Sequence, residues 1–195
     1  MSRTAHASEP AAETTSRTER LHRLYYVRFA FALVWAGLLA ATASTLTPVS
    51  VALLLVYPLF DCAAAGFDLR SSAAPRPRGP LGLNVALSLV TAVALAVAVA
   101  SGIPDVLRVW GAWAITAGIV QLVVAIQRYR LGGQWALILS GGISVVAGGA
   151  FIVMATGPKA SLTSLAGYAA LGGVFFLVSA IRLQRGAVKA DRSPA

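Results

Sequence analysis

The sequence predicts an all-α integral membrane protein, a six-helix bundle made of three antiparallel helical hairpins with both termini in the cytoplasm. Two observations carry this prediction: six long apolar stretches, and the confinement of basic residues to alternate gaps between them. A helix rises about 1.5 Å per residue, so about 20 residues cross about 30 Å of hydrocarbon. The six stretches that meet this length lie at residues 25–45, 48–67, 81–101, 106–127, 134–156 and 161–183.

The apolar stretches are predicted to be helices because they are continuously apolar and do not alternate as strands of a membrane barrel do. The composition agrees, since 57% of the residues are hydrophobic and only 12% are charged. The mean hydropathy of +0.75 is also typical of a chain that lies largely in lipid. These features exclude most classes of soluble enzyme.

The orientation follows from the basic residues, which accumulate in cytoplasmic segments of membrane proteins. One set of gaps and tails holds 14 of the 16 Lys and Arg residues: Arg3, Arg17, Arg20, Arg23, Arg28, Arg70, Arg76, Arg78, Arg128, Arg130, Arg182, Arg185, Lys189 and Arg192. The other set holds only Arg108 and Lys159. The pattern therefore predicts a multi-pass membrane protein with both termini in the cytoplasm.

The net charge of +9 is assigned to the membrane and not to nucleic acid. The basic residues flank membrane spans and face an anionic inner leaflet, where each contributes about 1 kcal/mol of attraction. The lipid bilayer is therefore the predicted partner. Cys62 is the only cysteine and excludes a disulfide within the chain.

The chain is predicted to contain one folded domain. Residues 1–16 are rich in Ala, Ser, Thr and Glu and are expected to form a disordered cytoplasmic tail. Residues 17–185 form the six-helix transmembrane domain, and residues 186–195 form a second cytoplasmic tail. Most connections are short, so consecutive helices are expected to be antiparallel neighbours.

An internal repeat supports the hairpins. The fourth span, WAITAGIVQLVVAIQRYR, aligns with the sixth, YAALGGVFFLVSAIRLQR, so that Gly118 falls on Gly173 and Arg130 on Arg185. The second span, YPLFDCAAAGFDLR, fits more loosely. Repeats of equal orientation are related by an axis along the membrane normal.

Small residues are predicted to pack the helices. Gly141 and Gly148 lie seven residues apart in the fifth span, on one stripe where backbones can approach closely, and Gly118 and Gly173 serve the fourth and sixth spans. This interpretation is favoured over a substrate groove, and the same residues would also suit a homo-oligomer. Trp110 and Trp113, near the predicted outer boundary, are interpreted as interfacial anchors.

The motifs of the last three spans carry a resemblance to a known family. The segment QWALILSGGISVVAGGAFIVMATGP, followed by a Gly-Tyr-Ala helix that ends in AIRLQR, resembles the HdeD-like family of small bacterial membrane proteins. The resemblance implies six spans and a hairpin repeat. It also implies a role in acid or envelope stress tolerance, because the founding member is associated with acid resistance. It implies no catalytic residue.

The candidate polar site lies in the second span. Asp61 lies inside this span, and an ionisable side chain in a span costs about 2.5–3.5 kcal/mol and normally has a partner or a purpose. Arg28 is within reach if the first two spans are antiparallel neighbours, and Asp68 competes with Asp61 for it. Either Asp61 couples to proton or cation movement, or it forms a structural ion pair. Asn84 and Gln121 are expected to hydrogen-bond across helices.

No catalytic, cofactor-binding or metal-binding motif occurs in the sequence. The sequence therefore predicts a non-enzymatic inner-membrane protein that resembles HdeD-like proteins and acts in acid or envelope stress tolerance. The alternative is a small proton-coupled transporter or channel that uses an intramembrane site of Asp61 and Arg28.

Overall fold

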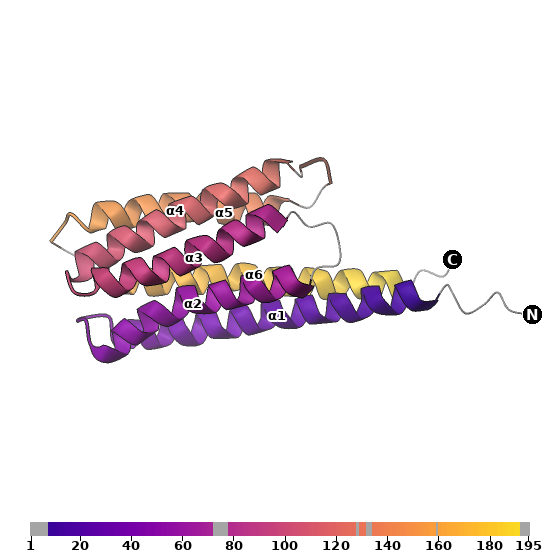
Figure 1. The fold of residues 1–195 in the computed structure, drawn as a ribbon, viewed down its shortest axis with the longest axis horizontal. Coiled ribbons are helices and arrows are strands. Elements are labelled where there is room, and N and C mark those ends of the chain that lie inside the picture. Colours follow the sequence, from indigo (N-terminus) through magenta and orange to yellow (C-terminus); the bar gives the residue numbers. More distant parts are fainter. Residues whose placement is uncertain (1–7, 72–77, 128, 132–133, 159, 192–195) are drawn as a thin grey trace, which may run out of the picture.

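A computed structural model of the chain describes residues 8–71, 78–127, 129–131, 134–158 and 160–191 (Figure 1). The described residues form helices and no strand: α1 (Ser8–Ala41), α2 (Pro48–Ser71), α3 (Arg78–Ala98), α4 (Ile103–Gln127), the short 3-10 helix η1 (Tyr129–Leu131), α5 (Trp135–Met154) and α6 (Thr163–Asp191). Six of them are long and apolar enough to cross a membrane, over His22–Ala41, Pro48–Phe67, Gly79–Ala98, Ile103–Gln127, Trp135–Met154 and Thr163–Arg182. The all-helical class and the six apolar helices are therefore confirmed.

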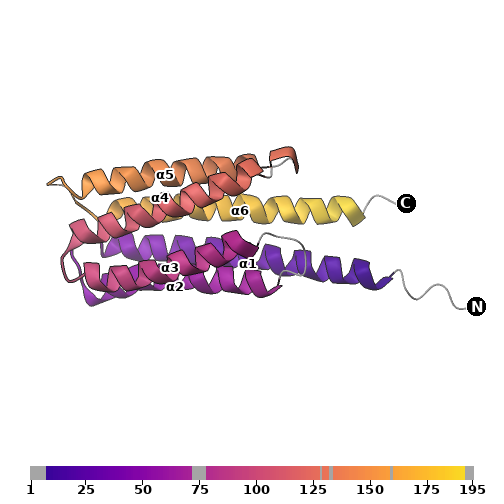
Figure 2. The ribbon, with the colours of Figure 1, turned by 45° about the horizontal axis from the view of Figure 1, so that its top comes forward.

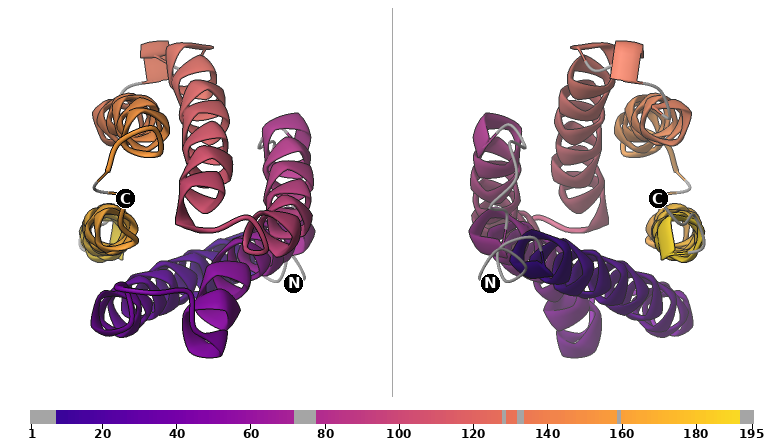
Figure 3. Two further views of the ribbon diagram at one scale, coloured as in Figure 1. Left: turned by 90° about the vertical axis from the view of Figure 1, so that its left-hand side faces the viewer. Right: turned by 90° about the vertical axis from the view of Figure 1, so that its right-hand side faces the viewer.

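The six long helices form a closed ring in chain order. Within the described ranges, each helix packs on the helix that follows it, and α6 packs back on α1. Views along the bundle show α4 and α5 on one side and α1 and α2 on the other, with α6 and α3 completing the ring between them (Figure 3). The start of α1 and the end of α6 extend beyond the other helices at the same end of the bundle (Figure 2).

The contacts around the ring are uneven. The most extensive interfaces lie between α4 and α5, between α1 and α6, and between α2 and α3. The interfaces of α1 with α2 and of α5 with α6 are much less extensive. The closest-packed pairs are thus offset by one helix from the three hairpins that the repeat suggests.

The helix ends follow local rules. At the start of α2, the backbone N–H of Thr47 donates to Ser50 Oγ at 2.7 Å and the N–H of Ser50 donates to Thr47 Oγ1 at 3.2 Å, a reciprocal capping arrangement. Before α4, Gly102 adopts a φ of 105°, which favours glycine. At the other end of the bundle α1 begins at Ser8, within the predicted tail of residues 1–16, and Pro10 lies in the first turn, where a missing N–H is tolerated.

Large side chains fill the centre of the ring. Those that are fully buried include Trp35, Leu39, Leu54, Leu95, Leu107, Trp110, Leu162 and Leu165. Other large apolar side chains face outward, as Val97 (69% exposed) and Val146 (75%) illustrate. The interpretation of Trp110 and Trp113 as interfacial anchors is wrong: they are 0% and 8% exposed, because their face of α4 points at the aromatic side chains of α1 and α2.

Candidate functional site

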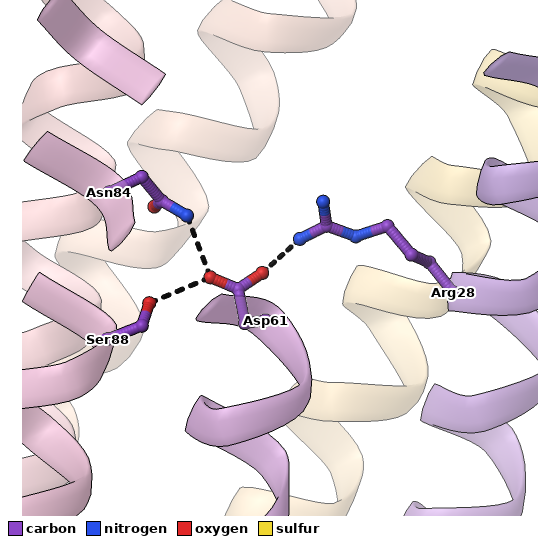
Figure 4. Close-up of polar contacts among 4 residues, drawn as sticks. All are labelled: Arg28, Asp61, Asn84 and Ser88. Carbon is purple, nitrogen blue, oxygen red and sulfur yellow. Dashed lines mark hydrogen bonds and ion pairs between the residues drawn. The ribbon is translucent and has the colours of Figure 1, made fainter. Parts of the chain in front are cut away.

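The carboxylate of Asp61 is held by side chains from two neighbouring helices (Figure 4). Arg28 of α1 forms an ion pair with Oδ1. From α3, Asn84 Nδ2 donates to Oδ2 at 2.8 Å and Ser88 Oγ donates to the same oxygen at 2.9 Å. We call these four residues the Asp61 cluster.

The helices bring the cluster together because its members lie at one depth. Arg28 and Asp61 are each about 20 Å along their helices from the connection between α1 and α2, at about 1.5 Å per residue. Asn84 and Ser88 are four residues apart on α3 and therefore share one face. The positions of these residues along α1, α2 and α3 thus bring them together in one site.

Both oxygens of Asp61 accept hydrogen bonds, and the bond from Arg28 joins two charged groups. The side chains of Arg28 and Asp61 are 14% and 16% exposed, so water screens the pair only weakly. An ionised carboxylate only accepts hydrogen bonds, and here a guanidinium, an amide and a hydroxyl supply the donors. The arrangement neutralises the charge of Asp61 and ties α1, α2 and α3 together.

The guanidinium of Arg28 has a second contact, on α6. Its carbon Cζ lies 4.5 Å from the centre of the Phe176 ring, within the range of a cation–π interaction. Phe176 also stacks on Tyr25, with ring centres 6.1 Å apart. Through Arg28 the Asp61 cluster is therefore linked to α6 as well as to α2 and α3.

The other predicted site residues are distributed as follows. The side chain of Asp68 lies outside the described part of the structure. Asn84 bonds across helices as expected, whereas the buried Oε1 of Gln121 finds no hydrogen-bond partner within the described ranges. Ser88 and Phe176 were missed by sequence reasoning. A signal for Ser88 existed, because it follows Asn84 by one helical turn in a largely apolar span.

The predicted packing glycines lie at two different interfaces. A Cβ atom placed on Gly118 would lie 2.6 Å from the carbonyl oxygen of Gly141, and one placed on Gly148 would lie 2.5 Å from the carbonyl oxygen of Gly111. The backbones of α4 and α5 therefore touch at two levels. Gly173 instead faces α1, where an added Cβ would lie 3.2 Å from the Cβ of Ala32.

Other polar groups offer little further chemistry. Arg108 pairs with Asp105 one turn earlier, on the surface at the start of α4. No group of three or more His, Cys, Asp or Glu residues that could hold a metal ion occurs in the described ranges. The Asp61 cluster is therefore the candidate site.

Comparison of the chain with known protein families, with curated proteins and with solved structures finds no match. The resemblance to HdeD-like proteins thus stays a prediction from the motifs of the last three spans.

Proposed function

We propose that the chain is a multi-pass protein of the bacterial inner membrane, with three antiparallel hairpins and both termini in the cytoplasm. The six apolar helices and the distribution of Lys and Arg support this topology. A membrane-impermeant thiol reagent, applied to cells that carry the protein with Cys62→Ser, tests it. Lys159→Cys should be labelled from outside and Arg130→Cys should not; the reverse labelling would overturn the orientation.

Within that membrane we propose a non-enzymatic role in acid or envelope stress tolerance, exerted through lipid and protein contacts, including contacts with the anionic leaflet and with other copies of the chain. The observation that carries the proposal is that both carboxylate oxygens of Asp61 already accept hydrogen bonds from other side chains of the chain. The deepest carboxylate of the chain is engaged by Arg28, Asn84 and Ser88, so its charge serves to hold helices together. The HdeD-like motifs supply the physiological setting.

Survival of a deletion strain after a shift to acid or after envelope damage tests this role. The wild-type chain should restore survival, and a variant that folds poorly, such as Asp61→Leu, should not. The double variant Arg28→Met with Asp61→Leu, which removes the charges as a pair, should restore survival if the cluster is structural. Equal survival of the deletion strain and its parent under every stress would remove the proposal.

A second candidate is a small proton-coupled transporter or channel, and one observation favours it. Arg28 and Asp61 join α1 to α2, whose interface is one of the least extensive in the ring, and both side chains remain partly exposed. A proton that reached Asp61 would weaken the link between these helices. Flux in proteoliposomes across a pH gradient separates the candidates: transport that is lost in folded Asp61→Asn favours the transporter, and absence of flux favours the structural role.

A further inference from the structure

Four aromatic side chains meet in the middle of the helix ring, and we call them the aromatic cluster: Trp35 of α1, Tyr57 of α2, and Trp110 and Trp113 of α4. Tyr57 contacts all three indoles, with ring centres 4.6 Å from Trp35, 5.6 Å from Trp110 and 6.0 Å from Trp113. Trp110 lies 5.4 Å from both Trp35 and Trp113. The cluster is thus a continuous group of rings from three helices.

The three indole N–H groups of the cluster differ in their partners. Trp35 Nε1 donates to the carbonyl oxygen of Leu53 at 2.6 Å, in the turn that precedes Pro58. The Nε1 atoms of Trp110 and Trp113 are buried and have no hydrogen-bond partner within the described ranges. Two donors in contacting rings are therefore left unpaired at the centre of the bundle.

Unpaired buried donors are uncommon because they forfeit the hydrogen bond that water would supply. A buried tryptophan usually finds an acceptor for its N–H group. We propose that the aromatic cluster holds bound water, which accepts hydrogen bonds from the indole N–H groups of Trp110 and Trp113. Because an enclosed water needs no path across the membrane, this inference is independent of either proposed function.

The chemistry of the cluster favours water over an anion. An indole N–H only donates, so the occupant must accept hydrogen bonds. Arg28 of α1 is paired with Asp61, so its charge is not free to balance an anion at the cluster. The indole N–H groups of Trp110 and Trp113 supply the two polar partners that a bound water needs.

One competing arrangement lies within the cluster itself. The ring planes of Trp110 and Trp113 meet at 83°, and those of Tyr57 and Trp113 at 80°. An edge-to-face contact of this kind can direct an N–H group at the face of a neighbouring ring, which is a weak hydrogen bond. The experiments must therefore separate a water acceptor from an aromatic one.

Nuclear magnetic resonance of the indole-¹⁵N-labelled protein in lipid nanodiscs makes this separation. The N–H signals of Trp110 and Trp113 should show magnetisation transfer from a long-lived water, and that of Trp35, bonded to Leu53, should not. Tyr57→Phe removes transfer relayed by the exchanging hydroxyl, and the water signals should persist in it. Absence of water contact at both Trp110 and Trp113 would overturn the proposal in favour of ring acceptors.

Replacement of single tryptophans by benzothienylalanine gives an independent measurement, because this residue keeps the two-ring shape and replaces N–H by sulfur. If water is bound, replacement at Trp110 or Trp113 should raise the unfolding equilibrium constant about 2- to 10-fold. Trp35 provides a control of similar loss, and exposed Trp135 a control of no change. An unchanged or lowered constant at both positions would show that the donors were unpaired and would overturn the proposal. So would stabilisation that depends on chloride, which would indicate an anion.

Discussion

The contact between α4 and α5 and the junction of α1, α2 and α3 stabilise two sides of one helix ring by opposite means. On the first side, glycines bring backbones together at Gly111 with Gly148 and at Gly118 with Gly141. On the second side, a charged pair and two polar side chains join helices across the Asp61 cluster. The α4–α5 interface depends on the absence of side-chain atoms at its glycines. The junction of α1, α2 and α3 depends on the presence of polar side chains.

The difference reflects how helices associate in lipid, which is as apolar as their own side chains. Without a hydrophobic driving force between helices, close van der Waals contact or interhelical hydrogen bonds must provide the attraction. The α4–α5 interface uses close van der Waals contact, at its two glycine pairs. The α1–α2 interface is small, so van der Waals contact across it is limited. The ion pair and hydrogen bonds of the Asp61 cluster supply the attraction there. The two sides should therefore fail under different substitutions.

The largest expected effect comes from removing one charge of the Asp61 cluster. Asp61→Leu leaves the guanidinium of Arg28 partly buried without its carboxylate, and we expect a loss of about 3 kcal/mol in the free energy of unfolding. Reversible unfolding in mixed detergent micelles, followed by near-ultraviolet circular dichroism, measures this loss.

The control for Asp61→Leu is the double variant in which Arg28→Met accompanies it. Removal of both charges should recover most of the lost stability, since no unpaired ion remains. A double variant as unstable as the single one would show that the hydrogen bonds of Asn84 and Ser88, and not the ion pair, carry the junction.

The second effect is at the glycine interface. Gly148→Ala places a methyl group 2.5 Å from the carbonyl oxygen of Gly111 and 2.9 Å from the backbone nitrogen of Ile115, so α4 and α5 must separate. We expect a loss of about 2 kcal/mol, in the range for overpacked interiors. Gly149→Ala is the matched control, because its added methyl meets no atom within 4 Å and should cost nothing. Equal stability of the two variants would contradict the backbone contact.

Many features of these two interfaces could be predicted from the sequence, for physical reasons. Length and hydropathy determine which segments can cross lipid, so the six helices follow from composition. Glycines at helical spacing indicate a close-packed stripe, and an aspartate inside a span requires a partner at the same depth, for which Arg28 was the natural choice.

Other features could not be predicted, because they depend on how the helices turn toward each other. The sequence repeat pairs α4 with α6 as equivalent helices, but it does not tell that Gly118 and Gly173 each face the next helix of the ring, α5 and α1 respectively. Trp110 and Trp113 have the positions of interfacial anchors, but a tryptophan near a span end can face either lipid or core. Only the rotation of α4 in the ring decides between these environments.

A smaller effect is expected at Ser88, which tests whether the cluster acts as a unit. Ser88→Ala removes one of two hydrogen bonds to Asp61 Oδ2 and leaves that of Asn84, so we expect a loss of about 1 kcal/mol. Ser179→Ala is the control, because the Ser179 hydroxyl donates to the carbonyl oxygen of Phe175 in its own helix. A loss at Ser179 as large as at Ser88 would indicate a general effect of serine removal in the bundle.

The smallest effect concerns Phe176, the contact that extends the Asp61 cluster to α6. Phe176→Leu keeps an apolar side chain against Arg28 but removes the ring face, and we expect a loss of about 0.5 kcal/mol. A double-mutant cycle with Arg28→Met isolates the cation–π term from the change in packing. Because Phe176 also stacks on Tyr25, the cycle is repeated with Tyr25→Leu, which shares the packing change and lacks the cation. A coupling energy with Arg28 indistinguishable from zero would confine the Asp61 cluster to α1, α2 and α3.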